Sequence, residues 1–270
     1  MKDLLHPRHR HALAELVGGD PPRKVLLAFD YDGVLAPIVK DPAGATMRER
    51  TRALLARLVQ RYPVAVVSGR AWKDTNRFVG GVVPTVVGNH GFELGRPVPV
   101  PAAVLRQVRA WRRRLEASLA GVPGVHFEDK RSTLAVHYGL SRAWRRAGRA
   151  VYEAANQLEG TRLIPGKKVL NVLPRDFPSK GDAVRALVAD LGLDAALYVG
   201  DDVTDEDVFA VGPPLVFGVH VGAGPTLAEW RLRTQEDVDV LLRLLAEARE
   251  RAARSPREGG RARAAAGRGR

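Results

Sequence analysis

Short uninterrupted runs of hydrophobic residues alternate along this chain with longer segments in which hydrophobic residues recur every three or four positions. The first run, Val25–Phe29, leads directly into Asp30 and, two residues later, Asp32. Comparable runs occupy residues 63–67, 85–87, 196–199 and 214–219. An apolar run of this length between polar turn residues predicts a strand that is buried on both faces.

The segments with helical periodicity lie between these runs. They predict helices over residues 6–18, 46–62, 72–79, 180–191, 203–210 and 236–252. Ser179 precedes the helix over 180–191 and Asp182 lies in its first turn, so both residues favour a helix start there. Because strand and helix alternate, the sequence predicts βαβ units and an α/β fold with a Rossmann-like parallel sheet.

The pattern changes after the proline-rich joint at residues 97–101. Two helical segments, 102–119 and 141–158, are each followed by a pair of short strands. These strands fall at residues 125–128, 133–138, 161–164 and 168–173. Two hairpins of this kind predict an antiparallel sheet with one open face. The block therefore reads as a separate small α-β-β-α-β-β domain inserted into the first domain.

The chain is accordingly expected to divide into four parts. These are an N-terminal helix and linker at 1–22, a core at 23–97 and 175–250, a cap at 98–174, and a disordered Arg-rich tail at 251–270.

Composition narrows the class of protein. The 270 residues include no cysteine, which excludes disulfides and thiolate metal sites. The first eleven residues are polar and do not resemble a signal peptide. No apolar run approaches the roughly 18 residues that span a membrane. We therefore expect a cytoplasmic protein without a membrane partner.

The net charge of +13 suggests nucleic acid as a partner. However, residues 251–270 alone hold seven Arg and one Glu, and the remainder of the chain is only mildly basic. Such a charge suits an anionic substrate equally well. The sequence shows no aromatic platform and no known nucleic-acid motif that would support nucleic-acid binding. A basic nucleic-acid-binding protein thus stays the weaker alternative.

Polar groups follow the predicted strands and begin one predicted helix. They are Asp30 with Asp32, Ser68, Lys180, and Asp201 with Asp202. In an open α/β sheet, the carboxyl ends of the strands form the crevice where ligands bind. Each group alone is equally compatible with a solvated turn or a surface side chain, and only the set favours chemistry.

The residue types in this set suit phosphoryl transfer. Asp30 is a carboxylate that can accept a phosphoryl group, and Lys180 and Ser68 can hold the charged oxygens. Asp201 and Asp202 add carboxylates of the kind that Mg²⁺ requires. Asp32 remains to protonate the leaving oxygen and to activate water.

As a set, four segments resemble the motifs of the haloacid dehalogenase superfamily of phosphatases. They are Asp30–Leu35, Ser68–Arg70, Lys180 and Gly200–Asp202. Further segments resemble the trehalose-6-phosphate phosphatase family within it. They are Gly88–Glu93, Glu128–Lys130, Leu134–Tyr138, Gly166–Leu170 and Gly200–Asp207. The resemblance covers about residues 24–245 and implies a haloacid dehalogenase core with an α+β cap of the C2B type.

For the catalytic centre, the resemblance implies that Asp30 is the nucleophile and Asp32 the acid and base, while Ser68 and Lys180 hold the phosphoryl group. It implies one Mg²⁺ cofactor. The implied metal residues are Asp30, Asp32 through its backbone carbonyl, and Asp201, with Asp202 and Asp205 in support.

For the substrate, the resemblance implies contacts to sugar hydroxyls from the cap and from one core loop. The implied residues are Glu128, Lys130 and Lys167 on the cap, and Asn89 and His90 on the core. The implied reaction is hydrolysis of trehalose 6-phosphate through an aspartyl-phosphate intermediate, by a monomer.

Two positions depart from the family pattern. Gly139 stands where an arginine is usual, and Asn171 stands where a glutamate is usual. Both belong to the surface that would read the sugar, so they leave its identity open. A phosphatase of another sugar phosphate, of the glucosylglycerol or sucrose type, is therefore the alternative.

Overall fold

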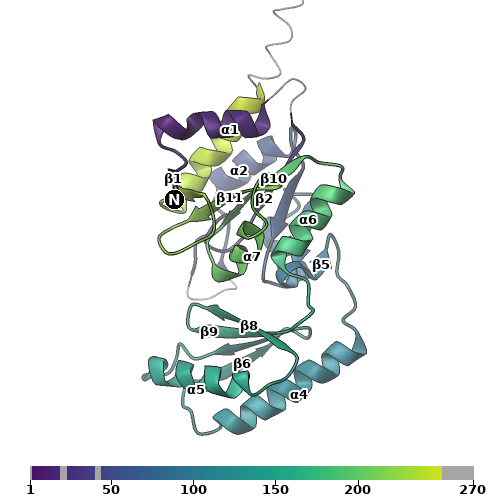
Figure 1. Ribbon diagram of the computed structural model, residues 1–270, viewed down its shortest axis with the longest axis vertical. Coiled ribbons are helices and arrows are strands. Elements are labelled where there is room, and N and C mark those ends of the chain that lie inside the picture. The colour runs from purple at the N-terminus through teal and green to yellow at the C-terminus, as the bar shows by residue number, and fades with distance from the viewer. Residues whose placement is uncertain (1, 19–22, 40–43, 251–270) are drawn as a thin grey trace, which may run out of the picture.

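The core is built on one twisted sheet that runs through the middle of the molecule, and the cap lies against one end of it (Figure 1). The computed structural model describes residues 2–18, 23–39 and 44–250. Within these residues the core sheet has eight strands in the order β1-β12-β11-β10-β2-β3-β4-β5.

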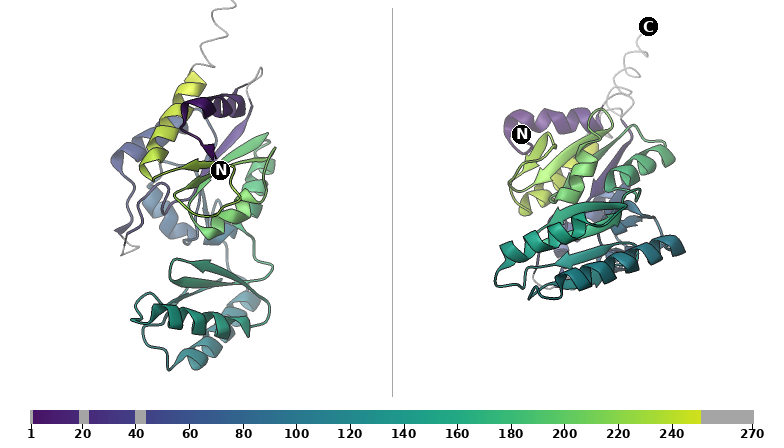
Figure 2. Two further views of the ribbon diagram at one scale, coloured as in Figure 1. Left: turned by 60° about the vertical axis from the view of Figure 1, so that its left-hand side comes forward. Right: turned by 60° about the horizontal axis from the view of Figure 1, so that its bottom comes forward.

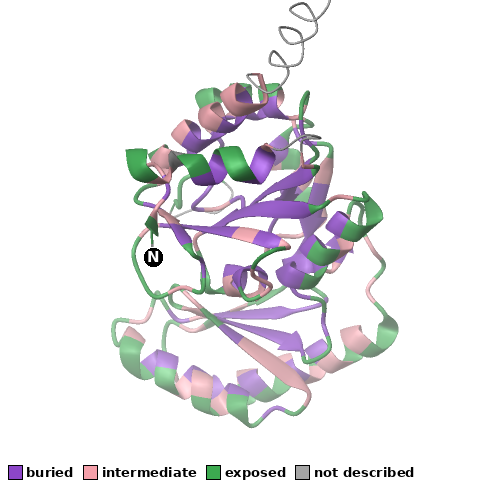
Figure 3. Ribbon diagram, turned by 45° about the horizontal axis from the view of Figure 1, so that its top comes forward, coloured by how far each residue is buried: buried purple, intermediate pink, exposed green. Residues whose placement is uncertain are grey.

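The centre of this sheet confirms the predicted buried strands. It consists of β2 (Val25–Phe29), β3 (Val64–Val67), β4 (Thr85–Gly88), β10 (Ala195–Gly200) and β11 (Val216–Val221). Neighbours among these strands pair in parallel. Every residue of β2, β3 and β10 is buried, because helices cover both faces of the sheet (Figure 3).

Two helical layers cover the sheet. Helices α1 (Arg10–Val17), α2 (Glu49–Leu58) and α3 (Trp72–Val79), together with residues 236–250, pack on one face around one hydrophobic cluster. Helices α6 (Lys180–Asp190) and α7 (Glu206–Phe209) pack on the other face around a second cluster. The last two residues of the predicted final helix, and the predicted tail at 251–270, lie outside the described residues.

Several boundaries differ from the sequence prediction. The strand predicted at 214–219 begins at Val216, since Pro214 has no N–H to donate to the ladder. The helix predicted over 203–210 divides into a 3₁₀ turn, Val203–Asp205, and the short α7. Three short strands at or near the sheet edges were not predicted, since two or three residues show no periodicity. They are β1 (Lys2–Asp3), β5 (Glu93–Leu94) and β12 (Trp230–Leu232).

The cap follows the predicted α-β-β-α-β-β order. It comprises α4 (Ala102–Leu119), β6 (His126–Asp129), β7 (Leu134–His137), α5 (Trp144–Asn156), β8 (Thr161–Gly166) and β9 (Val169–Pro174). The four strands form an antiparallel sheet in the order β6-β7-β9-β8. Helices α4 and α5 lie on the side away from the core (Figures 1 and 2).

Alternation along the cap strands gives the sheet two different faces. Leu134 and Val136 of β7 point into the cluster beneath the two helices. Ala135, between them, is opposite Glu128 on one neighbouring strand and Asn171 on the other. Directly paired residues share a face of the sheet, so Glu128 and Asn171 lie on the face turned toward the core.

Two connections join the cap to the core, after β5 and before α6. Phe177, in the second connection, stacks on Phe92 of the core loop just before β5, with 4.5 Å between the ring centroids. Ile164 and Leu173 of the cap complete this small cluster. An ion pair between Arg162 of β8 and Asp207 of α7, at 3.7 Å, provides a further contact between the two domains.

Candidate active site

Asp30 is the first residue after β2, at the carboxyl end of the middle of the sheet. Its side chain is buried, and both oxygens accept hydrogen bonds. The backbone N–H of Tyr31 donates to Oδ1 at 2.6 Å, and Nζ of Lys180 donates to Oδ2 at 2.8 Å. The structure therefore brings together Asp30 and Lys180, which are 150 residues apart in the chain.

Lys180 is the first residue of α6, and its position is fixed by a capping box. Ser179 Oγ accepts a hydrogen bond from the backbone N–H of Asp182, whose carboxylate accepts one from the N–H of Ser179. The Lys180 ammonium, 1% exposed, lies 2.8 Å from carboxylate oxygens of both Asp30 and Asp205. Burial opposes its charge, but the two carboxylates outweigh this and raise the pKa of Lys180.

Three carboxylates, from Asp30, Asp201 and Asp205, gather around this lysine. Each offers an oxygen within 4.8 Å of the others. Burial, followed by the charges of Asp205 and Asp202, raises the pKa of Asp201 to about 7. Oxygen donors that repel one another in this way fit a hard divalent cation, which would relieve the repulsion.

The three carboxylates are not equivalent. Asp205 accepts hydrogen bonds from Lys180, from the Tyr198 hydroxyl, and from the backbone N–H groups of Asp201 and Asp202. Donors therefore already engage both of its oxygens, and its contribution is to hold the loop after β10. Asp202 is exposed and lies outside the cluster.

Gly33 makes room for this arrangement. Its φ of +76° favours glycine, and a Cβ atom at this position would lie 2.0 Å from Oδ2 of Asp201. The turn after Asp32 thus lets the loop after β10 approach the loop after β2. This explains why the Asp-x-Asp-Gly segment ends in glycine.

Asp32 does not join the carboxylate cluster, because its side chain is paired with Arg70. The guanidinium donates from Nε at 2.6 Å and from Nη2 at 2.7 Å to the two carboxylate oxygens. Arg70 also lies over the ring of Phe78, with 4.9 Å between its Cζ and the ring centroid. The sequence analysis assigned no role to this arginine, although it follows directly on Ser68-Gly69.

Ser68 is buried at the end of β3. Its hydroxyl oxygen accepts a hydrogen bond from the backbone N–H of Arg70, and its carbonyl oxygen accepts one from the N–H of His90. Ser68 therefore stands between the loops that carry Arg70 and His90, on the same edge of the sheet as Asp30.

The loop after β4 places Asn89 and His90 with left-handed φ angles of 48° and 58°. Nδ2 of Asn89 donates to Glu93 at 2.8 Å, while Oδ1 of Asn89 and both ring nitrogens of His90 are buried without a partner. Burial, then the charges of Lys130 and Lys180, lowers the pKa of His90. The imidazole is therefore neutral, with hydrogen-bonding capacity unused. Glu93, which orients Asn89, had no assigned role in the sequence analysis.

The predicted cap residues are placed differently from one another. Oε2 of Glu128 is hydrogen-bonded to Nε2 of His137 at 2.9 Å, and Oε1 of Glu128 lies 3.9 Å from Nζ of Lys130. Lys130 is largely enclosed, and burial lowers its pKa, with the positive charge of Arg70 acting in the same direction. Lys167, by contrast, is exposed at the tip of the β8–β9 hairpin. The structure thus turns Glu128 and Lys130 toward the core and leaves Lys167 apart from them.

Comparison with known proteins agrees with this arrangement. The family model described as Trehalose-phosphatase matches residues 28–235, which include all the candidate residues above. The chain belongs to the trehalose-phosphatase family. This membership also accounts for the haloacid dehalogenase core.

Individual members of the trehalose-phosphatase family show the extent of the similarity. Trehalose-phosphate phosphatase of Mycobacterium ulcerans (strain Agy99) is 36% identical over 221 residues, covering 77% of this chain and 56% of that protein. Probable trehalose-phosphate phosphatase 4 of Oryza sativa subsp. japonica is 30% identical over 262 residues, covering 89% and 71%. The chain thus spans little more than half of the mycobacterial relative.

A solved structure shares the fold. The C-terminal domain of Candida albicans trehalose-6-phosphate phosphatase superposes with a TM-score of 0.73 at 24% identity, covering 88% of this chain and 96% of that domain. None of the described helices of this family member is long and apolar enough to cross a membrane.

The two departures from the trehalose-phosphatase pattern lie at different places on the cap. Asn171 is buried on the face turned toward the core, and its Nδ2 donates to the carbonyl of Ile164 at 3.5 Å. Gly139 is exposed, where a Cβ atom would lie 3.3 Å from Cβ of Lys168. Asn171 is therefore the departure that shares the core-facing side of the cap sheet with Glu128, two strands away.

Proposed function

We propose that this protein is a Mg²⁺-dependent phosphatase that hydrolyses trehalose 6-phosphate to trehalose and phosphate. The observation that carries this proposal is the buried Asp30, oriented by Lys180 and Tyr31 and facing a cap surface of polar side chains. Membership of the trehalose-phosphatase family supports the choice of substrate.

In the first step, a carboxylate oxygen of Asp30 attacks phosphorus and the bond from phosphorus to the sugar oxygen breaks. Lys180 lies beside the attacking carboxylate, so its charge can stabilise the negative charge on the phosphoryl oxygens. The leaving sugar oxygen takes a proton from Asp32. In the second step Asp32 takes a proton from water, which attacks the aspartyl phosphate and restores Asp30.

Asp30 and Asp201 would hold the Mg²⁺ ion, together with the backbone carbonyl of Asp32, while Asp202 and Asp205 would support the loop. When bound, the ion would neutralise charge on the transferring phosphoryl group and on the carboxylate cluster. The chemistry of the donor set supports this role, because Asp201 keeps a raised pKa as long as no cation balances it.

The ion pair between Asp32 and Arg70 would have to open before Asp32 could transfer a proton. A carboxylate held by two hydrogen bonds from a guanidinium is neither a free acid nor a free base. We infer that substrate binding draws Arg70 toward the phosphate and releases Asp32 for proton transfer. Arg70 would then hold Asp32 in place until the phosphate arrives.

Recognition of the sugar would come from both sides of the interface. Glu128, which is oriented by His137, and Lys130 would contact hydroxyls from the cap. Asn89 and His90 present unpaired polar atoms from the core. Such groups favour a substrate whose hydroxyls satisfy them, because each buried unpaired group costs about 1–3 kcal/mol. Lys167 would approach the sugar only if the hairpin tip moves toward the core.

A panel of sugar phosphates tests the proposal. Purified protein with Mg²⁺ should release phosphate from trehalose 6-phosphate with a higher kcat/KM than from sucrose 6-phosphate or glucosylglycerol phosphate. A preference of more than about tenfold, or 1.4 kcal/mol, for another sugar would contradict the assignment to trehalose and leave the phosphatase chemistry in place.

A further inference from the structure

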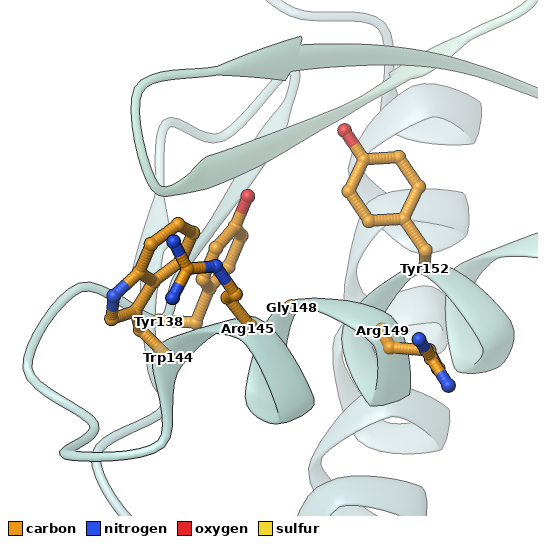
Figure 4. A pocket seen from close by; sticks show the side chains of 6 residues that line it. All are labelled: Tyr138, Trp144, Arg145, Gly148, Arg149 and Tyr152. Atoms are coloured by element: carbon orange, nitrogen blue, oxygen red, sulfur yellow. The ribbon is translucent and has the colours of Figure 1, made fainter.

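A cavity of about 270 Å³ lies on the outer side of the cap (Figure 4). Five of its lining residues come from one face of α5, and the sixth follows β7. They are Trp144, Arg145, Gly148, Arg149 and Tyr152, with Tyr138. Its walls are thus three aromatic rings and the guanidinium group of Arg145, while the side chain of Arg149 points away from the other labelled side chains (Figure 4).

The cavity is separate from the candidate active site. Tyr138 continues the alternation of Leu134 and Val136, whose side chains pack beneath the helices. Glu128 and Asn171 lie on the opposite face of the same sheet. A molecule in the cavity would therefore lie behind the cap sheet and would not reach Asp30.

Positive charge gathers at this cavity without an internal counter-charge. The cap carries 14 Lys and Arg against five Asp and Glu, a net charge of +9. Among the described residues, no ion pair involves Arg145, Arg149 or Lys168, whereas Arg112 of α4 pairs with Glu116 at 2.7 Å. The first turn of α5 contains no acidic residue and no side-chain cap, so nothing in it offsets the positive end of the helix dipole.

The aromatic rings are held in place by their neighbours. Arg145 Cζ lies 4.6 Å from the ring centroid of Trp144, and Lys168 Nζ lies 5.1 Å from the same centroid. Gly148 leaves room for the Tyr138 ring, because a Cβ atom at position 148 would lie 2.9 Å from Tyr138 Cε2. A glycine inside a helix is less favourable than alanine, and here it leaves the floor of the cavity aromatic.

We infer that this cavity binds a small anion that carries a ring, in the chemical class of ring-bearing phosphate monoesters. Arginine recognises a phosphate group through paired hydrogen bonds, and the aromatic walls stack on the flat face of a sugar or base. The volume suits a molecule of monosaccharide or nucleoside size. The same cavity lies beside Lys168 at the β8–β9 tip.

Calorimetric titration of the full chain tests the inference. The probes are glucose 6-phosphate, adenosine 5′-monophosphate and inorganic phosphate, so that sugar and base rings are distinguished from the anion alone. The pocket variant is Arg145→Gln with Arg149→Gln. The matched control is Arg106→Gln with Arg109→Gln, which removes the same charge from exposed positions on α4.

The pocket variant should lose at least tenfold in affinity for one of the two ring-bearing probes, while the control stays within twofold of the original protein. Trp144→Leu should reduce the advantage of the ring-bearing probe over inorganic phosphate. Circular dichroism and phosphate release from the substrate verify that each variant is folded. Equal affinities in the pocket variant and the control would overturn the inference, and so would binding of inorganic phosphate as tight as that of both ring-bearing probes.

Discussion

The core and the cap differ in charge and in how their polar side chains are held. The core, residues 23–97 and 175–250, has 19 basic and 21 acidic residues, whereas the cap has a net charge of +9. In the core, Asp30, Lys180 and Asp205 are buried and bonded to one another. On the cap, Glu128 is half exposed and Lys167 is exposed.

This contrast indicates that the core and the cap have different tasks. A preorganised set of buried charges suits a reaction whose electrostatics do not change from one substrate to another. A more open set of polar groups suits substrate recognition, in which each sugar hydroxyl contributes a modest increment of binding free energy. Substitutions in the two domains should therefore have different kinetic signatures, and the following predictions start with the largest expected effect.

Replacement of Asp30 by Asn should lower kcat by about 10⁴-fold or more, because the amide cannot accept the phosphoryl group. The loss should be equal for trehalose 6-phosphate and for p-nitrophenyl phosphate, which carries no sugar. Asp190→Asn, at an exposed position of α6, is the control and should leave kcat unchanged. Residual turnover of the Asp30→Asn protein above 1% would contradict the assignment of the nucleophile.

Replacement of Lys180 by Met should destabilise the fold as well as abolish catalysis. The change leaves Asp30 and Asp205 facing one another without their shared cation, at a cost of about 3–5 kcal/mol. Urea unfolding in metal-free buffer measures this free energy. Lys73→Met, at an exposed position of α3, should change it by no more than about 0.5 kcal/mol. Equal stabilities of the two variants would show that the lysine is not the counter-charge of the cluster.

On the cap, Glu128→Gln should raise KM for trehalose 6-phosphate about tenfold with a smaller change in kcat, since it removes a charged acceptor for sugar hydroxyls. Hydrolysis of p-nitrophenyl phosphate should be unaffected, in contrast to Asp30→Asn. Glu153→Gln on α5 makes the same chemical change at an exposed position and should alter neither substrate. A similar loss on both substrates would place Glu128 in the chemistry and not in recognition.

The smallest effect concerns pH. Since the pKa of Asp201 is raised to about 7 in the metal-free fold, this carboxyl is mostly protonated at pH 6 and mostly ionised at pH 8. Its contribution to stability is therefore greatest below pH 4 and falls as the pH rises through 7. Because the cation needs the ionised form, Mg²⁺ should bind roughly tenfold more tightly at pH 8 than at pH 6. Titration by thermal shift measures this ratio, and Asp201→Asn should remove it.

The sequence predicted much of this arrangement, for identifiable reasons. The strand before Asp30 and the helix that begins at Lys180 have strong local signals, and sheet topology alone brings their ends together. Ser179 caps this helix as expected, and the structure adds that Asp182 completes a capping box. These features depend on periodicity and chain direction, which the sequence contains.

Other features depend on how loops pack, which periodicity does not reveal. Asp32 pairs with Arg70 only because the loop after β3 turns back toward β2. Asp205 is engaged by four donors from three parts of the chain, so its role could not be read from the Asp201–Asp205 segment alone. Lys167 was grouped with Glu128 by motif, yet it lies at an exposed hairpin tip.

The stacked rings of Phe92 and Phe177 fix the returning crossing against the core loop just before β5, the strand from which the first crossing leaves. When the two ends of an inserted domain lie close together, the domain can be exchanged without cutting any strand of the core sheet. We therefore expect residues 98–174 to behave as a cassette, so that a chimera with a related cap spliced at these two crossings should keep the hydrolytic activity proposed for the core while acquiring a new substrate range.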